Sequence, residues 1–289
     1  MTFAPTDEQN QIIEAAQTTD DNLLITAYAG AAKTTTLELI ANALPSTRIL
    51  TLAFNKKIAE EMKLRLPENC SCRTLSSLGY GIWRESCPHK LNLDKSKTYR
   101  IVSGIIETAF SGQPDEQRQL YDRLADLMRV VDFGNQCGYV PTDEFPSAKE
   151  LLNDTEFIEH IDDELNETER WVVREATVKS IKECFQGNIN FNDMLFMPTI
   201  FRGAFPSFPL VLVDEAQDLS ALNHRMLQKL VNSGSKPSRL IAVGDECQAI
   251  YGFRGAHQNS MQLLQKSFHM QEHKLSISFR CAQNIVKEA

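Results

Sequence analysis

The chain has 289 residues, with 42% hydrophobic and 24% charged residues and a net charge of −8. This composition is typical of a globular protein and excludes one that is basic overall, although nucleic-acid binding needs only a local basic stripe. Seven cysteines without a Cys-x-x-Cys pair favour reduced thiols over disulfides or structural zinc. Because no apolar run reaches the about 20 residues of a membrane span and no signal segment is evident, we expect a cytoplasmic protein.

The first predicted element is a helix over residues 6–16, TDEQNQIIEAA. Thr6 is a suitable N-cap, and acidic residues occupy the first turn. Gln9 lies in that turn, shortly before the first predicted strand. Its amide offers both a donor and an acceptor, which the edge of adenine requires, so Gln9 is a candidate adenine contact. A solvated glutamine on a helix surface is the alternative.

Residues 23–36, LLITAYAGAAKTTT, combine an apolar strand, a turn of small residues and the start of a helix. This order is typical of a phosphate-binding loop, in which backbone N–H groups and a lysine face phosphates and a hydroxyl binds Mg²⁺. The match to GxxxxGK[ST] is imperfect, because alanines replace both glycines. A helix N-terminus that follows small packing residues is the alternative. The predicted nucleotide contacts are Ala29, Gly30, Ala31, Ala32, Lys33, Thr34 and Thr35.

A second strand is predicted over residues 48–54 and a helix over residues 56–66. Repeated strand–helix units indicate a parallel sheet with right-handed crossovers. Phe54, Asn55 and Lys56 then lie at the same sheet edge as the phosphate loop. An aromatic ring beside amide and cationic groups suits stacking and phosphate contacts with a single nucleic-acid strand. A core phenylalanine with solvated lysines is the alternative.

The next segment, residues 72–80, is rich in hydroxyl groups and precedes a helix. Thr74 and Ser76 are candidate contacts to a nucleic-acid backbone, because hydroxyl and N–H groups bind phosphate oxygens. They are equally suited to capping the helix.

Helical spacing dominates from about residue 91 to residue 186, with few strand candidates. Residues 143–169 within this region are strongly acidic, which we interpret as a solvated face rather than a binding tail. The strand–helix pattern returns near residue 188. Asp193 then starts a helix and is a further candidate for the edge that carries the phosphate loop.

Residues 209–218, PLVLVDEAQD, form an apolar run that ends in adjacent carboxylates. This pattern is typical of a central parallel strand that brings acids to its C-terminal edge. Asp214 is placed to bind Mg²⁺ and Glu215 to polarise an attacking water. Structural acids at a buried strand end are the alternative, but a lysine–threonine loop in the same chain favours a nucleotide hydrolase.

A further strand over residues 239–244 leads directly into GDECQAIYGFRGA. Gln248 follows that strand, so its amide is a candidate contact to the terminal phosphate. Tyr251, Phe253 and Arg254 then alternate aromatic and cationic groups, which suits base stacking, although core packing is the alternative for the two rings. A last short strand is predicted over residues 274–280, and Arg280 at its end is a candidate arginine finger.

Together these segments resemble the UvrD/Rep-like superfamily 1 helicases. TDEQ, AYAGAAKTTT, LAFNKKIAEEM, LVLVDEAQD, GDECQAIYGFRGA and LSISFR follow one another in the order and spacing of that family. The resemblance implies an α/β fold, a RecA-like P-loop parallel sheet flanked by helices, with an inserted and mostly helical subdomain. It also implies use of ATP and Mg²⁺ and translocation along single-stranded DNA, usually from 3′ to 5′. We expect a monomer without membrane association.

The resemblance implies a role for each matching residue. Gln9 would contact adenine and Lys33 would contact the phosphates. Thr34 and Asp214 would bind the magnesium ion. Glu215 would be the base for water, Gln248 the γ-phosphate sensor and Arg280 an arginine finger. The residues that would meet DNA are Phe54, Tyr251, Phe253 and Arg254. Two departures weaken the match: Ala32 replaces the glycine before the lysine, where a Cβ disfavours a positive φ, and Ser76 replaces a common histidine.

The expected division of the chain is a first nucleotide-domain part over residues 1–90, a helical insertion over 91–186 and a second part over 187–277. Residues 278–289 would begin a second motor domain, which the sequence truncates. Because hydrolysis in this family occurs between two such domains, we expect the chain alone to bind nucleotide weakly and not to unwind DNA.

The leading prediction is therefore the N-terminal motor half of an ATP-dependent DNA helicase. A non-catalytic nucleotide- or DNA-binding module that acts through a partner protein is the first alternative. A P-loop kinase is the second, but it gives no reason for GDECQAIYGFRGA.

Overall fold

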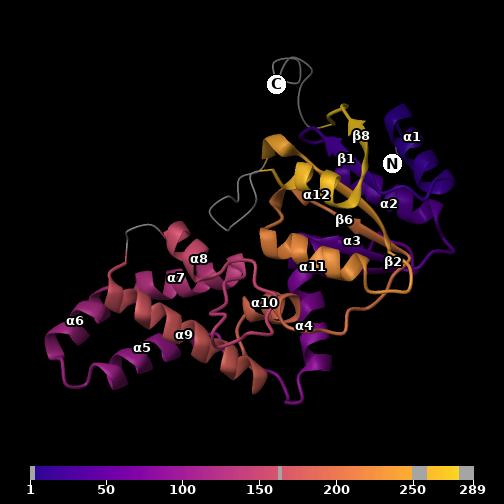
Figure 1. Cartoon of the computed structure of the whole chain (residues 1–289). Helices are drawn as coiled ribbons and strands as arrows, with labels where there is room; N and C mark the ends of the chain where they lie inside the picture. The colour runs from indigo at the N-terminus through magenta and orange to yellow at the C-terminus, as the bar shows by residue number, and fades with distance from the viewer. Residues whose placement is uncertain (1–3, 162–164, 249–258, 280–289) are drawn as a thin grey trace. The chain divides into compact units, whose positions relative to one another are not determined.

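The structure is a computed structural model that describes residues 4–161, 165–248 and 259–279 (Figure 1). The chain forms two compact units. The first, which we call the sheet unit, comprises residues 1–75, 205–220 and 227–289. The second, the helical unit, comprises residues 76–204 and 221–226.

The sheet unit contains a six-stranded sheet, built from the described residues, in the order β3-β2-β6-β7-β1-β8. Its strands are β1 (Leu23–Ala27), β2 (Ile49–Ala53), β3 (Cys70–Thr74), β6 (Leu210–Val213), β7 (Arg239–Gly244) and β8 (Gln271–Leu275). Every pair is parallel. The predicted α/β parallel sheet is therefore confirmed. β3 is an additional strand, because its polar sequence CSCRT lacks the apolar run that marks the others.

The central strands are apolar on both faces because helices cover both sides of the sheet. The core on one side contains residues of α1 (Asp7–Thr18), α2 (Lys33–Ala43) and α3 (Lys56–Lys63) together with alternate strand residues such as Ile25, Leu212 and Ile241. Figure 1 draws α12 (Ser260–Phe268) on the opposite side of the sheet from α1 and α2. The four residues of β6 are all buried, which fixes the position of the acids that follow them.

The second unit is mostly helical, as expected for the insertion, but it comprises residues 76–204 and 221–226, whereas the insertion was predicted over residues 91–186. Its helices are α4 (Leu75–Ser86), α5 (Lys97–Ala109), α6 (Pro114–Asp122), α7 (Leu124–Cys137), α8 (Asp154–Ile161), α9 (Glu167–Phe185) and α10 (Asp193–Ile200), with the first residues of α11 (Ala221–Val231). β4 (Asn92–Leu93) and β5 (Asn188–Ile189) form a short parallel pair beside them. One core cluster is shared by α5, α7 and α9, and the amphipathic spacing of α5 and α7 predicts that each turns one face toward it.

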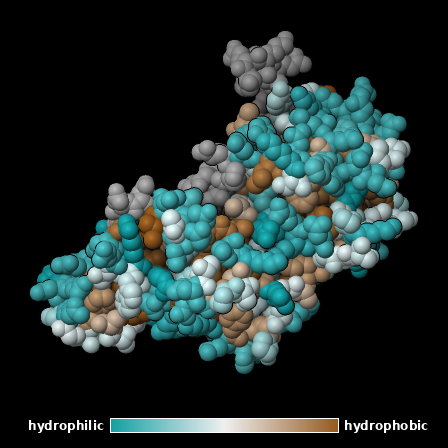
Figure 2. Space-filling view, in the orientation of Figure 1, coloured by the Kyte–Doolittle hydropathy of each residue, from teal (hydrophilic) through white to brown (hydrophobic). Residues whose placement is uncertain are grey.

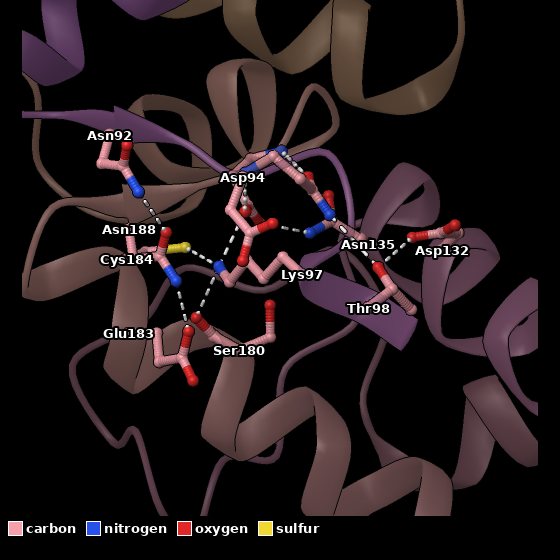
Figure 3. Close-up of polar contacts among 12 residues, drawn as sticks. Asn92, Asp94, Lys97, Thr98, Asp132, Asn135, Ser180, Glu183, Cys184 and Asn188 are labelled. Carbon is pink, nitrogen blue, oxygen red and sulfur yellow. Dashed lines mark hydrogen bonds and ion pairs between the residues drawn. The ribbon is translucent and has the colours of Figure 1, made fainter. Parts of the chain in front are cut away.

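A buried ion pair lies inside the helical unit. The ammonium group of Lys97 donates to Asp193 Oδ2 at 2.8 Å, to the Ser180 carbonyl oxygen at 2.9 Å and to Cys184 Sγ at 2.9 Å. Figure 3 shows Lys97 pointing toward Ser180 and Cys184 on α9. The side chains of Lys97 and Asp193 are 0% and 1% exposed. Burial alone would lower the pKa of Lys97, but the charge of Asp193 and the contact with Cys184 raise it overall.

The expectation that Asp193 faces the phosphate loop is therefore wrong. Asn135 Nδ2 donates to Asp193 Oδ1 at 3.0 Å, and the Asn190 backbone N–H donates to Asp193 Oδ2 at 2.7 Å. The carboxylate is thus fully occupied within the helical unit. An acid at a helix start has the same local sequence signal whether it faces solvent or a buried lysine, and Lys97 lies 96 positions away.

Within the described residues no helix is both long and apolar enough to cross a membrane. The face of the molecule in Figure 2 is mostly hydrophilic, with apolar residues in small separate patches.

Replacing Lys97 with alanine should lower the free energy of unfolding by about 3–5 kcal/mol, because it leaves the Asp193 carboxylate buried without its cation. Denaturant unfolding followed by circular dichroism measures this loss. The exposed neighbour Lys95 provides the control, and Lys95→Ala should change stability by less than about 0.5 kcal/mol. The double variant Lys97→Met with Asp193→Leu should recover only part of the loss, because Asn135 Nδ2 and the Asn190 N–H then lose their acceptor. A cost below about 1 kcal/mol for Lys97→Ala would show that the pair does not support the unit.

Candidate active site

The C-terminal ends of three adjacent strands carry the polar residues of the site. β7 lies between β1 and β6, and all three are parallel, so the segments that follow them meet at one edge of the sheet unit. The loop of residues 28–32 follows β1, Asp214 and Glu215 follow β6, and the turn η3 (Glu246–Gln248) follows β7. This is the edge at which open parallel sheets bind ligands.

The loop after β1 is a tight turn of small residues. The Ala31 N–H donates to the Tyr28 carbonyl oxygen at 3.0 Å, and Gly30 has a φ of 74°. Ala32 also has a left-handed conformation, with φ 57° and ψ 40°, and α2 begins at the next residue. A left-handed conformation costs an alanine about 1–2 kcal/mol, so the loop keeps a shape that glycine adopts without strain.

Two contacts connect this loop to the acids after β6. Lys33 Nζ lies 3.0 Å from Glu215 Oε2, and the Thr34 hydroxyl donates to Asp214 Oδ2 at 2.8 Å. Asp214 is 2% exposed, whereas the Glu215 side chain is 25% exposed. The structure therefore brings together four residues that the sequence predicted to act together from positions nearly two hundred residues apart.

Burial raises the pKa of Asp214 to about 6, and the neighbouring charge of Glu215 adds to this rise. The pKa of Asp218 is raised to about 6 for the same two reasons, burial first and Glu215 second. Crowded carboxylates of this kind favour a nearby cation, because it offsets their mutual repulsion. Asp214 and Thr34 present two hard oxygen atoms side by side, the donor type that Mg²⁺ prefers.

No group of three or more His, Cys, Asp or Glu side chains among the described residues is arranged to hold a metal ion. A Mg²⁺ ion at Thr34 and Asp214 would therefore depend on water and substrate oxygens for its remaining ligands. Mg²⁺ is commonly bound in this way, by one or two protein groups together with phosphates. The donor set fits magnesium that is carried by a nucleotide.

Gln217, in the turn η2 (Ala216–Asp218), connects the acids to the segment after β7. Its Nε2 donates to Glu215 Oε2 at 2.9 Å, and its Oε1 accepts from the Asp245 N–H at 3.0 Å. Gln248 Nε2 in turn donates to Asp245 Oδ2 at 2.6 Å. Gln217 and Asp245 were not predicted from the sequence, although DEAQD places Gln217 two residues after the predicted base.

These elements surround a pocket of about 390 Å³. It is lined by Gly30, Ala31, Ala32, Lys33, Thr34, Thr35, Glu215, Gln248 and Phe279. Eight of these residues were predicted, and Phe279 was not, because only the arginine of SISFR indicated a phosphate contact. Phe279 is 60% exposed, so it offers an aromatic surface at the wall of a polar pocket.

Two other predicted nucleotide contacts lie next to the pocket. The Ala29 carbonyl oxygen accepts from the Ser278 hydroxyl at 2.6 Å. Gln9 is 4% exposed, and both ends of its amide are engaged: Oε1 accepts from the Thr6 N–H and Nε2 donates to the Thr36 hydroxyl at 3.1 Å. Contact with adenine would require Gln9 to exchange these bonds, and its role stays a prediction.

The predicted DNA contacts are placed in part. Phe54 is half-buried after β2, Asn55 Oδ1 caps α3, and Lys56 is 88% exposed beside Glu60. Thr74 ends β3, whereas Ser76 is exposed on α4 in the helical unit. The residues that lie outside the described part of the chain are Tyr251, Phe253, Arg254 and Arg280.

Known proteins that are similar in sequence to this chain include several DNA helicases. The F-box DNA helicase protein 1 of Schizosaccharomyces pombe is 25% identical over 87% of this chain and 28% of its own length. The ATP-dependent DNA helicase UvrD1 of Mycobacterium leprae is 24% identical over 92% of this chain and 37% of its own. The ATP-dependent DNA helicase PcrA of Leuconostoc citreum is 26% identical over 97% and 38%. The chain therefore spans about a quarter to two fifths of the length of these relatives.

The family model of the UvrD/REP helicase N-terminal domain matches residues 6–197 and 189–269, which is most of the chain. Both parts of the match include residues that line the pocket. The chain belongs to the UvrD/REP helicase family, as part of its N-terminal domain.

Proposed function

We propose that the chain is the ATP-binding part of a DNA-dependent ATPase, the motor of a DNA helicase. The observation that carries this proposal is the convergence of Lys33, Thr34, Asp214 and Glu215 beside one pocket. A cation, a hydroxyl and two acids around a loop of small residues are the groups that nucleoside triphosphate hydrolysis needs. The names of the relatives, all DNA helicases, support nucleic acid as the activator.

The structure suggests how the residues divide the work. A triphosphate in the pocket competes with Glu215 for the Lys33 ammonium group, so its binding releases the Glu215 carboxylate to accept a proton from water. The Thr34 hydroxyl and the Asp214 carboxylate would hold the magnesium ion. Bound there, magnesium would neutralise charge on the phosphate oxygens. Gln217 acts as a positioning residue, because its amide fixes the carboxylate of Glu215.

Gln248 and Phe279 are the proposed contacts to the two ends of the nucleotide, the terminal phosphate and the base. Gln248 lines the pocket with Glu215 and is anchored through Asp245, which suits contact with the terminal phosphate. Phe279 presents an exposed ring on the wall of the same pocket, which suits stacking on the base. Arg280, the proposed arginine finger, is the next residue in the sequence.

For single-stranded DNA we propose Phe54, Asn55, Lys56 and Thr74 as contacts, since β2 and β3 end at the edge of the sheet that carries the pocket. Ser76 and the aromatic and basic groups of Tyr251, Phe253 and Arg254 are proposed for the same role. For movement along DNA we propose the direction that the family resemblance implies, from 3′ to 5′.

The alternative of a non-catalytic binding module has one observation in its favour, the left-handed conformation of Ala32. Alanine carries a strain of about 1–2 kcal/mol in this conformation, and a loop that relaxed from it would no longer present the same N–H groups to phosphates. The two proposals differ in turnover: the motor hydrolyses ATP when single-stranded DNA is added to the full-length protein, and the module does not.

Lys33→Met should weaken binding of Mg·ADP to this chain by about tenfold or more, because it removes the cation that faces the phosphates. Calorimetric titration measures the affinity. Lys56→Met, which removes an exposed lysine that is paired only with Glu60 among the described contacts, is the matched control and should leave nucleotide affinity unchanged. Equal affinities for Lys33→Met and the unmodified chain would refute the proposed site.

Glu215→Gln in the full-length protein should retain nucleotide binding and reduce DNA-stimulated turnover by about 10²-fold or more, since a positioned general base is lost. Gln217→Ala should lower turnover less, because the base remains but is no longer held by an amide. Phosphate release measures both. Turnover above about a tenth of the unmodified rate in Glu215→Gln would mean that another group accepts the proton.

Ala32→Gly should raise the free energy of unfolding by about 1 kcal/mol, measured by denaturant unfolding, because glycine adopts the left-handed conformation without the strain that alanine carries. Mg·ADP affinity should not fall, since the loop already has this conformation without nucleotide. Ala31→Gly is the matched control. Ala31 is buried and is not among the residues with a positive φ, so the same change there should destabilise the protein by about 0.5–1 kcal/mol without a gain in affinity. Weaker binding by Ala32→Gly would show that the alanine side chain helps to form the site.

A further inference from the structure

The segment that follows β8, residues 276–279, runs directly beside the phosphate loop. The Tyr28 N–H donates to the Leu275 carbonyl oxygen at 3.0 Å, which continues the pairing of β1 with β8. The Ser278 hydroxyl donates to the Ala29 carbonyl oxygen at 2.6 Å, and the Phe279 N–H donates to the Gly30 carbonyl oxygen at 3.0 Å. The segment that carries Phe279 is thus hydrogen-bonded to the backbone carbonyl oxygens of Ala29 and Gly30 in the loop.

The other end of this segment is held by Glu8, in the first turn of α1. Glu8 Oε2 accepts from the Ser276 N–H at 2.8 Å, and Glu8 Oε1 accepts from the Ser276 hydroxyl. Both oxygens of one carboxylate therefore bind one residue. Hydrogen bonds to an ionised carboxylate are among the stronger ones in proteins, and a two-point contact also fixes orientation.

The first turn of α1 also contacts the other side of the loop. Gln9, the next residue, donates to the Thr36 hydroxyl in the first turn of α2. Adjacent residues of α1 thus hold the helix that follows the loop and the segment that lies beside it. Neither Glu8 nor Ser276 lines the pocket, so any effect on a ligand must pass through the residues that they position.

We propose that Glu8 and Ser276 form a clasp that positions Phe279 for the base of the bound nucleotide. This inference rests on the proposed function of the pocket. The clasp fixes residue 276, the loop carbonyl oxygens fix residues 278 and 279, and the ring of Phe279 then needs no further ordering when a base stacks on it. Such preorganisation lowers the entropic cost of binding. The clasp acts on the base and leaves the phosphate contacts of Lys33 and Thr34 unchanged.

A purely structural role of Glu8 is separable from this one. An acidic residue in the first turn of a helix also stabilises it through the helix dipole. Asp7 occupies the same turn, is exposed and has no hydrogen bond to the 276–279 segment. Asp7→Ala therefore removes the same kind of helix stabilisation and leaves the clasp intact.

The test compares two probes of the same pocket, Mg·ATP and Mg·tripolyphosphate, which lacks the base and the ribose. Calorimetric titration of this chain gives both affinities. Phe279→Ala should weaken ATP binding by about 5- to 100-fold, the range expected for loss of base stacking on an aromatic ring. Glu8→Ala and Ser276→Ala should each weaken it by a smaller factor, about 3- to 10-fold. Tripolyphosphate affinity should change by less than about twofold in all three variants.

Glu8→Gln keeps the length and one acceptor of the side chain, so its ATP affinity should lie between those of the unmodified chain and Glu8→Ala. Asp7→Ala should match the unmodified chain for both probes. Ser276 is exposed and loses only a hydroxyl group, so Ser276→Ala tests the clasp even where Glu8→Ala fails to fold.

Equal weakening of ATP and tripolyphosphate by Ser276→Ala, or no weakening of either, would overturn the clasp. Failure of the proposed function gives a different result, in which Lys33→Met leaves tripolyphosphate binding unchanged. An unmodified chain that binds neither probe would overturn both proposals.

Discussion

The site depends on one juxtaposition, the contact of the helix that follows β1 with the acids that follow β6. The Lys33 ammonium group meets Glu215 at 3.0 Å and the Thr34 hydroxyl meets Asp214 at 2.8 Å. Neither contact is possible unless β1, β7 and β6 are adjacent and parallel, because only then do their C-terminal ends share an edge. The buried apolar strands therefore serve to bring these four polar side chains together. At this edge, burial and the charge of Glu215 raise the pKa of Asp214. A cation beside the two carboxylates offsets their repulsion and is therefore favoured.

Backbone strain accumulates on both sides of this contact. Ala32, before Lys33, and Glu215 itself have left-handed conformations, with φ of 57° and 51°. His269 is the other non-glycine residue with a positive φ in the described part of the chain. Residues held in such conformations concentrate at functional sites, where the surrounding fold over-determines them. At Glu215, the amide of Gln217 and the ammonium of Lys33 supply the fixed partners that hold the carboxylate in place.

Sequence patterns predicted the parts of the site that follow from strand order. An apolar run that ends in Asp-Glu and a turn of small residues before Lys-Thr are local signals, and parallel topology then brings them to one edge. The contacts that depend on side chains from distant segments could not be predicted in this way. Glu8 and Ser276 are separated by 268 positions, and Gln217 gave no signal beyond its place after Glu215. Asp193 shows the converse error, since a carboxylate at a helix start was assigned to the sheet edge but neutralises the buried Lys97 instead.

The central claim is that Lys33, Thr34, Asp214 and Glu215 meet one magnesium-bound triphosphate. A crystal structure of this chain with Mn²⁺ and a non-hydrolysable ATP analogue tests it most directly, because the anomalous signal of manganese locates the metal independently of the phosphates. The account predicts the metal beside Thr34 and Asp214, and the Lys33 ammonium turned from Glu215 to the phosphate oxygens. A metal bound elsewhere, or phosphates that leave the Lys33–Glu215 pair intact, would contradict it.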